Sequence, residues 1–180
     1  MIEPWETLDS HIAFQSRWVS LRQDRVRLPS GIVLDDYFVL QQPNFVKVFG
    51  YTAAGEVVFV RQYKHGIGRV VLELPAGFIE PGEAPMEAAI REMREETGYS
   101  SELRPAGSWV VDPTRTPTLE HVFWGEVVLS GKQRLDATED IEVRLVPAAN
   151  IRDMIASGEI ETLSTIAAAL YCLPLIGTGL

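Results

Sequence analysis

The segment GFIEPGEAPMEAAIREMREETGY, residues 77–99, carries the pattern that decides the fold of this chain. Helical periodicity that opens at Pro85 and closes at Gly98 predicts a helix over Pro85–Thr97. At about 100° per residue, Glu92, Glu95 and Glu96 share one narrow face of that helix. A separate stripe, expected to dock the helix on a core, consists of Met86, Ile90, Met93 and Thr97.

The three clustered carboxylates repel one another, so something should offset the cost of bringing them together. Hard divalent cations such as Mg²⁺ and Mn²⁺ bind clustered carboxylate oxygens, commonly together with substrate phosphates. A solvated acidic face is the alternative interpretation. The spaced glycines, the arginine and the preceding loop favour a metal site, because a merely soluble helix has no need of them. Glu87, one turn before Arg91, is expected to form an ordinary surface ion pair with it.

The spacing of the segment is G-x5-E-x7-R-E-U-x-E-E-x-G-U, where U is apolar or aromatic, and every fixed position is met. In this pattern the chain resembles the Nudix hydrolase family. The resemblance implies an α/β fold, a Nudix α/β/α sandwich with a mixed sheet. It also implies a pyrophosphohydrolase in which Mg²⁺, with Mn²⁺ as the alternative ion, is held against a diphosphate that water cleaves.

Carried over by position, the resemblance assigns a role to each charged residue of the segment. Glu92 and Glu96 would be the principal metal ligands, with Glu95 as a further one. Arg91 would orient the glutamates. Glu83, at the start of the helix, would assist through water or hydrogen bonding.

The preceding residues ELPAG, at 73–77, resemble the segment found in ADP-ribose and related nucleoside diphosphate sugar pyrophosphatases. In that branch the carbonyl at the position of Ala76 is a metal ligand. Pro113 stands where the branch tends to carry a proline near the substrate, although a lone proline in a loop is commonplace. The branch also has a β-rich N-terminal arm that exchanges between two subunits, which implies a homodimer.

The branch places a glutamate in a late, mobile loop as general base or extra ligand. Glu139 matches that place best by its spacing to the following strand, with Asp140 and Glu142 as close rivals. A solvated acidic loop remains the alternative interpretation.

Residues that would contact the substrate depart from the branch in part. Lys64 stands where an arginine usually grips a phosphate, and Gln41 where an arginine is common. Trp18 and Tyr37 could stack on a base across a dimer interface, although a strand tryptophan is more often a core residue.

The 180 residues carry 25 acidic and 16 basic side chains, for a net charge of −9, which argues against broad binding to nucleic acids or anionic membranes. The single cysteine, Cys172, cannot form an internal disulfide, and no export signal precedes the first strand, so a reducing, cytoplasmic location is expected. The longest apolar stretch, 166–176, contains Pro174 and is too short to span a membrane.

Strands are expected at 11–14, 18–21, 25–28, 32–40, 44–51, 57–62, 70–74, 109–111, 121–129 and 141–147, and further helices at 148–157 and 161–173. This order predicts a β-rich arm at 1–43 and a catalytic domain at 44–180, which the resemblance identifies as a Nudix hydrolase domain.

The reaction expected is Mg²⁺-dependent hydrolysis of a nucleoside diphosphate sugar, with ADP-ribose, giving AMP and ribose 5-phosphate, ahead of GDP-mannose or a dinucleotide. A nucleotide-sugar-binding regulatory domain without catalysis is the alternative from another class. Isomerase chemistry on isoprenoid diphosphates, which uses an active-site cysteine in one Nudix relative, is disfavoured because Cys172 lies in an apolar helical run.

Overall fold

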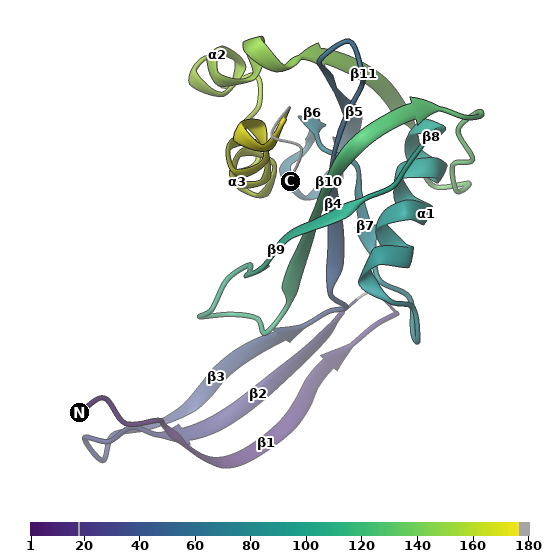
Figure 1. The fold of residues 1–180 in the computed structure, drawn as a ribbon. Helices are drawn as coiled ribbons and strands as arrows, with labels where there is room; N and C mark the ends of the chain where they lie inside the picture. The colour runs from purple at the N-terminus through teal and green to yellow at the C-terminus, as the bar shows by residue number, and fades with distance from the viewer. Residues whose placement is uncertain (18, 177–180) are drawn as a thin grey trace. The chain divides into compact units, whose positions relative to one another are not determined.

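The computed structural model describes residues 1–17 and 19–176 (Figure 1). By its contacts the chain forms two compact units. The first comprises Met1–Asn44 together with Val110–Leu119, and the second comprises Phe45–Trp109 together with Glu120–Leu180.

The strands are β1 (Glu6–Gln15), β2 (Ser20–Arg27), β3 (Val33–Gln41), β4 (Phe45–Tyr51), β5 (Glu56–Lys64), β6 (Arg69–Glu73), β7 (Ala76–Phe78), β8 (Tyr99–Ser101), β9 (Arg104–Val110), β10 (Leu119–Leu129) and β11 (Ile141–Pro147). The helices are α1 (Pro85–Thr97), α2 (Ile151–Ala156) and α3 (Leu163–Cys172), with short 3₁₀ turns η1 (His65–Ile67), η2 (Ala148–Asn150) and η3 (Leu173–Leu175).

The first unit is built on an antiparallel sheet in the order β1-β2-β3. The separate strands predicted at 18–21 and 25–28 are wrong, because the charged residues between them continue β2. Asp24 is buried there, and its carboxylate accepts hydrogen bonds from Arg22 Nε at 2.9 Å and from Ser10 Oγ at 2.6 Å. Hydrogen bonding to Arg22 lowers the pKa of Asp24, so the charged carboxylate is stabilised inside the strand. The polar residues around Asp24 gave no sign in the sequence that the strand continues through them.

The second unit contains a mixed sheet in the order β11-β5-β4-β10-β8, with β6 on β5, β7 on β4 and β9 on β10. β10 runs parallel to β4, whereas β4 and β5, β5 and β11, and β8 and β10 pair antiparallel. The three-residue strands β7 and β8 were not predicted, because such short segments carry no alternating pattern.

Two apolar layers cover the two faces of this sheet, and strand alternation assigns each residue to one of them. Val46 and Val48 of β4 pack with Ala88, Ala89 and Met93 of α1. The second layer lies on the other face of the sheet. Its strand residues are Phe49, Val57, Phe59, Val122 and Trp124, and its helical residues are Ile151 of α2 and Ala168, Ala169 and Cys172 of α3. The ribbon shows α1 on one side of the sheet and α2 and α3 on the other (Figure 1). The expected α/β/α sandwich with a mixed sheet is therefore confirmed.

Gly50 lets α1 approach the sheet closely. A Cβ at this position would lie 2.7 Å from Met93 Cε and 2.7 Å from Val127 Cγ1. The predicted docking stripe of α1 is wrong at one residue, because Ile90 is 40% exposed and Ala88 and Ala89 are buried instead. The small alanine side chains permit a close approach of the helix to the sheet, which a stripe of larger apolar residues does not indicate.

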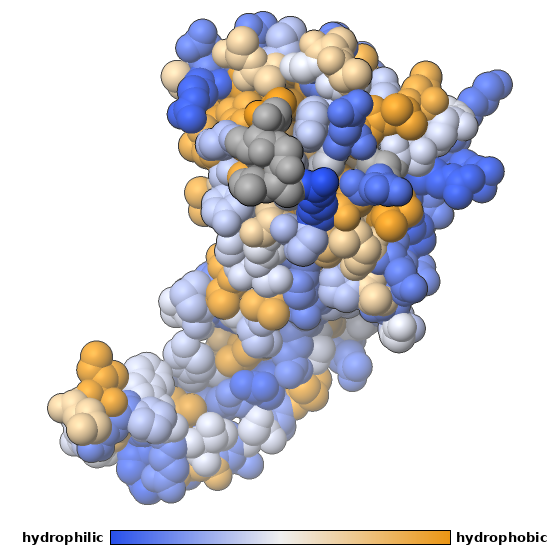
Figure 2. All heavy atoms as spheres, viewed as in Figure 1, coloured by the Kyte–Doolittle hydropathy of each residue, from blue (hydrophilic) through white to orange (hydrophobic). Residues whose placement is uncertain are grey.

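Exposed apolar side chains lie mostly singly or in small groups among hydrophilic ones on the face shown in Figure 2. In the described part of the chain, no helix combines the length and apolar character needed to cross a membrane.

Candidate active site

Helix α1 begins and ends where its sequence predicts. Pro85 occupies the first turn, where no intrahelical N–H is required, and the Ala84 N–H donates to the Glu87 carboxylate at 3.1 Å. Gly98 adopts a left-handed φ of 77°, and its N–H donates to the Arg94 carbonyl at 2.9 Å. The prediction of a surface ion pair between Glu87 and Arg91 is wrong. In the described part of the chain, the Glu87 carboxylate instead accepts the Ala84 N–H at the start of the helix.

Arg91 is the hub of the carboxylate cluster. Its Nε and Nη2 donate to the two oxygens of Glu83 at 2.8 Å and 2.9 Å, a bidentate pair. Its Nη1 donates to Glu92 Oε1 at 2.6 Å and to Glu95 Oε2 at 3.2 Å. Nη2 also donates to the Phe78 carbonyl at 3.0 Å. One guanidinium thus connects the loop before the helix to the acidic face of the helix.

Glu92 depends on a glycine in the preceding strand. A Cβ on Gly77 would lie 2.0 Å from the Glu92 carboxyl carbon and 2.0 Å from its Oε1, so only glycine leaves room for this carboxylate. Gly77 pairs with Val46 in the β4–β7 ladder, which fixes its backbone against the sheet. The glycine of the motif is therefore required here by close approach to a carboxylate.

Glu96 lies one turn further along the helix and is 3% exposed. Its Oε2 accepts a hydrogen bond from the Ala76 N–H at 3.1 Å. The Val48 N–H donates to the Pro75 carbonyl at 2.9 Å, which holds the same backbone segment on β4. Ala76 and Glu96 are thus brought together, although they are far apart in the sequence.

Burial and mutual repulsion favour protonation of these carboxylates. Burial, and then the charges of Glu92 and Glu139, raise the pKa of Glu96 to about 8, against the lowering effect of the Ala76 hydrogen bond. Burial also raises the pKa of Glu92 despite its bond to Arg91. Glu83 behaves oppositely, because hydrogen bonding to Arg91 lowers its pKa. A bound cation would supply the positive charge that Glu92 and Glu96 lack.

Glu139 lies close enough to act on both buried carboxylates electrostatically, since its charge raises the pKa of Glu92 and of Glu96. Its carboxylate accepts a hydrogen bond from the Asp136 N–H at 3.0 Å. Glu142, one of its rivals, instead forms ion pairs with Arg61 at 3.4 Å and Arg144 at 3.0 Å.

Gln133 ties the loop that carries Glu139 to the helix. Its Nε2 donates to the Glu96 carbonyl at 2.7 Å and to the Ile141 carbonyl at 3.0 Å. The Arg134 N–H donates to the Glu95 carbonyl at 2.8 Å. This anchor was not predicted, because a lone glutamine in a polar loop carries no sequence pattern.

Lys64 forms an ion pair with Glu73 at 3.3 Å, and its charge lowers the pKa of Glu96.

A second lysine, Lys47, was not predicted as a notable residue, although its position inside the apolar run 45–49 indicated a buried charge. Lys47 is buried beside Glu120, and burial lowers its pKa.

Tyr37 and Pro113 belong to the other unit, where they lie near each other. The Tyr37 hydroxyl donates to the Thr114 carbonyl at 2.7 Å, and its ring makes an edge contact with Trp5. Pro113 sits in a turn closed by the Arg115 N–H on the Asp112 carbonyl at 3.1 Å. Trp18 lies outside the described residues.

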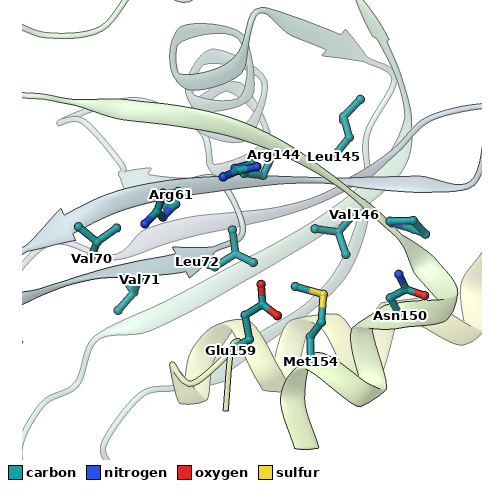
Figure 3. Close-up of a pocket in the computed structure, with 11 residues that line it drawn as sticks. Arg61, Val70, Val71, Leu72, Arg144, Leu145, Val146, Asn150, Met154 and Glu159 are labelled. Carbon is teal, nitrogen blue, oxygen red and sulfur yellow. The ribbon is translucent and has the colours of Figure 1, made fainter. Parts of the chain in front are cut away.

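A cavity of about 560 Å³ lies elsewhere, between the sheet and α2 (Figure 3). Arg61 and Arg144 line its strand side, and Asn150, Met154 and Glu159 line its helical side. None of its lining residues belongs to the carboxylate cluster.

Comparison with known proteins agrees with this geometry. The family described as NUDIX domain matches residues 43–166, and the one described as nucleoside diphosphate sugar hydrolase N-terminal domain matches residues 5–40. The chain belongs to the Nudix family. The resemblance drawn from residues 77–99 is thereby confirmed, and with it the expectation of a hydrolase.

Relatives of this Nudix protein span most of its length. An ADP-ribose pyrophosphatase of Bacillus subtilis (strain 168) is 30% identical over 169 residues, covering 92% of this chain and 91% of that protein. An ADP-ribose pyrophosphatase of Mycobacterium tuberculosis (strain ATCC 25618 / H37Rv) is 29% identical over 175 residues, covering 92% and 82%. A crystal structure of ADP compounds hydrolase aligns with a TM-score of 0.88 over 99% of this chain and 98% of that one, at 19% identity, which shows a shared fold.

Nudix hydrolases generally need divalent metal ions. Among the residues described, no three His, Cys, Asp or Glu side chains form a ready metal-binding group. Arg91 engages oxygens of Glu92 and Glu95 instead. The donors nevertheless fit a hard cation, because Glu92 and Glu96 are buried carboxylates without full charge compensation, next to the backbone of residues 76–77.

Replacing Gly77 by alanine should displace the Glu92 carboxylate, because the new Cβ would overlap it. We expect Mn²⁺ binding, measured by electron paramagnetic resonance, to weaken more than about tenfold. Gly66→Ala is the control, since a Cβ there meets nothing within 4 Å. Equal Mn²⁺ affinity of the two variants would contradict the requirement for a glycine at position 77 beside the Glu92 carboxylate.

In metal-free protein, stability should fall as pH rises from about 4.5, the ordinary pKa of a glutamate, through about 8, the pKa of Glu96 in the fold. Folding favours the protonated form, so the stability present below pH 4.5 is lost on ionisation, by up to about 5 kcal/mol. Urea denaturation in EDTA measures this. Glu96→Gln should flatten the profile in that window, and a Gln variant that follows the wild-type curve would refute the assignment.

Proposed function

We propose that this chain hydrolyses the diphosphate bond of a nucleoside diphosphate sugar, with ADP-ribose as the leading substrate, releasing AMP and ribose 5-phosphate. The observation that carries the proposal is the pair of buried carboxylates, Glu92 and Glu96, held against residues 76–77 by Arg91 and the Ala76 N–H. Relatives described as ADP-ribose pyrophosphatases that align over most of the chain support the substrate class.

Glu92, Glu96 and Glu95, with the Ala76 carbonyl, would hold Mg²⁺, or Mn²⁺ in its place. The ion would supply Lewis acidity toward the diphosphate and a lowered pKa for a bound water. Arg91 keeps Glu92 and Glu95 in place through its Nη1. Glu83 binds the other edge of the guanidinium and so fixes its plane.

Two further residues act on water and substrate in this proposal. Glu139, on the loop anchored by Gln133, accepts a proton from the attacking water. Lys64 binds a substrate phosphate as a point charge, exchanging its bond to Glu73 for one to the phosphate oxygen. The roles of Tyr37 and Pro113 as substrate contacts stay predictions from the resemblance.

The arm at 1–43 would join two chains into a homodimer, with 44–180 as the catalytic domain. Three of its apolar side chains, Trp5, Ile12 and Phe14, are between 47% and 57% exposed. The match of residues 5–40 to a nucleoside diphosphate sugar hydrolase N-terminal domain supports a distinct arm. The cytoplasmic location stays a prediction from the single cysteine, which is buried.

Purified protein with Mg²⁺ should release phosphatase-sensitive product from ADP-ribose faster than from GDP-mannose, other nucleotide sugars, dinucleoside polyphosphates or NADH. Glu96→Gln should lower turnover more than about 100-fold and leave circular dichroism unchanged, because it removes a ligand charge and no apolar contact. Faster release from another member of the panel would replace ADP-ribose as substrate. Binding of ADP-ribose without release from any compound would favour a regulatory, non-catalytic domain.

Light scattering should give a mass twice the 20.1 kDa of one chain. Phe14→Glu should shift the protein toward monomer, because it places a charge on the exposed apolar face of β1. Val128→Glu, at a position that is 61% exposed in the second unit, is the control. A monomeric wild-type protein would exclude the dimer, and dissociation by the control alone would move the interface out of the arm.

A further inference from the structure

Lys47 is an unusual residue in the sheet. It lies in the apolar strand β4, between Val46 and Val48, and is 3% exposed. A lysine is almost never fully buried unless it is paired, because its ammonium loses hydration. The catalytic cluster described above does not use it directly, so its retention inside the sandwich requires another explanation.

Lys47 belongs to a buried polar group between the sheet and α3. Its Nζ donates to Thr165 Oγ1 at 3.2 Å and lies 3.8 Å from Glu120 Oε1. The Ser164 hydroxyl donates to the same Glu120 oxygen. Glu120 and Thr165 are also buried, so each polar atom needs its partner inside the protein.

Thr165 also connects Lys47 to the backbone of the active-site segment. Its Oγ1 accepts a hydrogen bond from the Leu74 N–H at 3.4 Å. A hydroxyl oxygen has two lone pairs, and an ammonium has only donors, so Lys47 and the Leu74 N–H together occupy both acceptor positions. Lys47 therefore orients the hydroxyl with its oxygen toward Leu74, and the proton of Thr165 must point elsewhere.

Leu74 is followed directly by the residues at the metal site. The segment Leu74, Pro75 and Ala76 is held in turn by Thr165, by the Val48 N–H and by Glu96. Lys47 is itself the register partner of Ala76 in the β4–β7 ladder. The buried group and the candidate ligands thus contact one short piece of backbone.

We propose that Lys47 is a positioning residue that, through Thr165, fixes the backbone of residues 74–76 at the depth where the Ala76 carbonyl and Glu96 serve one cation. This inference rests on the proposed function, since it concerns the same metal site. Replacing a residue that orients metal ligands without binding the metal itself often weakens metal affinity about tenfold or more.

The competing explanation is that Lys47 and Glu120 are only a core ion pair. Removing one partner of such a pair destabilises a protein strongly, whereas replacing both by apolar residues of similar size is often neutral or stabilising. The double variant Lys47→Met/Glu120→Met therefore separates the two roles. It removes the donor to Thr165 without leaving an unpaired buried charge.

The test measures Mn²⁺ binding without substrate, by electron paramagnetic resonance, alongside the melting temperature. Lys47→Met should lower both, with Mn²⁺ affinity reduced about tenfold. The double variant should recover the melting temperature and keep the weak Mn²⁺ binding. Thr165→Val, which removes the acceptor for Leu74, should weaken Mn²⁺ binding to a similar extent.

Ile151→Ala is the matched control, because Ile151 is fully buried in the same apolar layer and lies outside the polar group and the active-site segment. It should lower the melting temperature and leave Mn²⁺ affinity unchanged. Wild-type Mn²⁺ affinity in the double variant or in Thr165→Val would overturn the positioning role and leave the proposed function standing. Wild-type protein whose Mn²⁺ binding is absent, or unaffected by Glu96→Gln, would overturn both.

Discussion

The Arg91 guanidinium joins three carboxylates that would otherwise repel one another, and the arrangement of the site depends on it. Glu83 binds one edge of the guanidinium, and Glu92 and Glu95 bind another nitrogen. The same side chain also reaches the Phe78 carbonyl. Loop and helix are therefore held by a single planar, permanently charged group, which a lysine with one point charge could not reproduce.

The burial of Glu92 and Glu96 explains how a chain of net charge −9 can act on a polyanion. Excluding water from these carboxylates favours their protonated forms and leaves a demand for positive charge at one place. In the proposed function, a divalent cation would meet that demand and bind phosphate oxygens as well. The overall charge argues against broad phosphate-backbone binding, whereas the proposed local site would admit a metal-bound diphosphate.

Sequence patterns predicted the elements that have a regular apolar repeat or that begin and end at a proline or glycine. Helix α1 was predicted at both ends, because Pro85 and Gly98 act locally. The interior of β2 was not, because Asp24 gains its stability from Arg22 and Ser10, and only the folded sheet brings Ser10 near. Ile90 was placed on the wrong face for a related reason, since Gly50 and two alanines let the helix turn its small side toward the sheet.

The sequence by itself determined the family, the acidic face of α1 and the identity of its charged residues, because helical spacing is a local property of the chain. Only the tertiary structure decided which partner each charge has. It brought the Ala76 N–H to Glu96 and placed Glu139 within electrostatic reach of both buried carboxylates. It also brought Lys47 to Thr165, whose hydroxyl oxygen accepts the Leu74 N–H of the neighbouring backbone. These contacts join residues far apart in the chain, and their burial sets the charge state of each group.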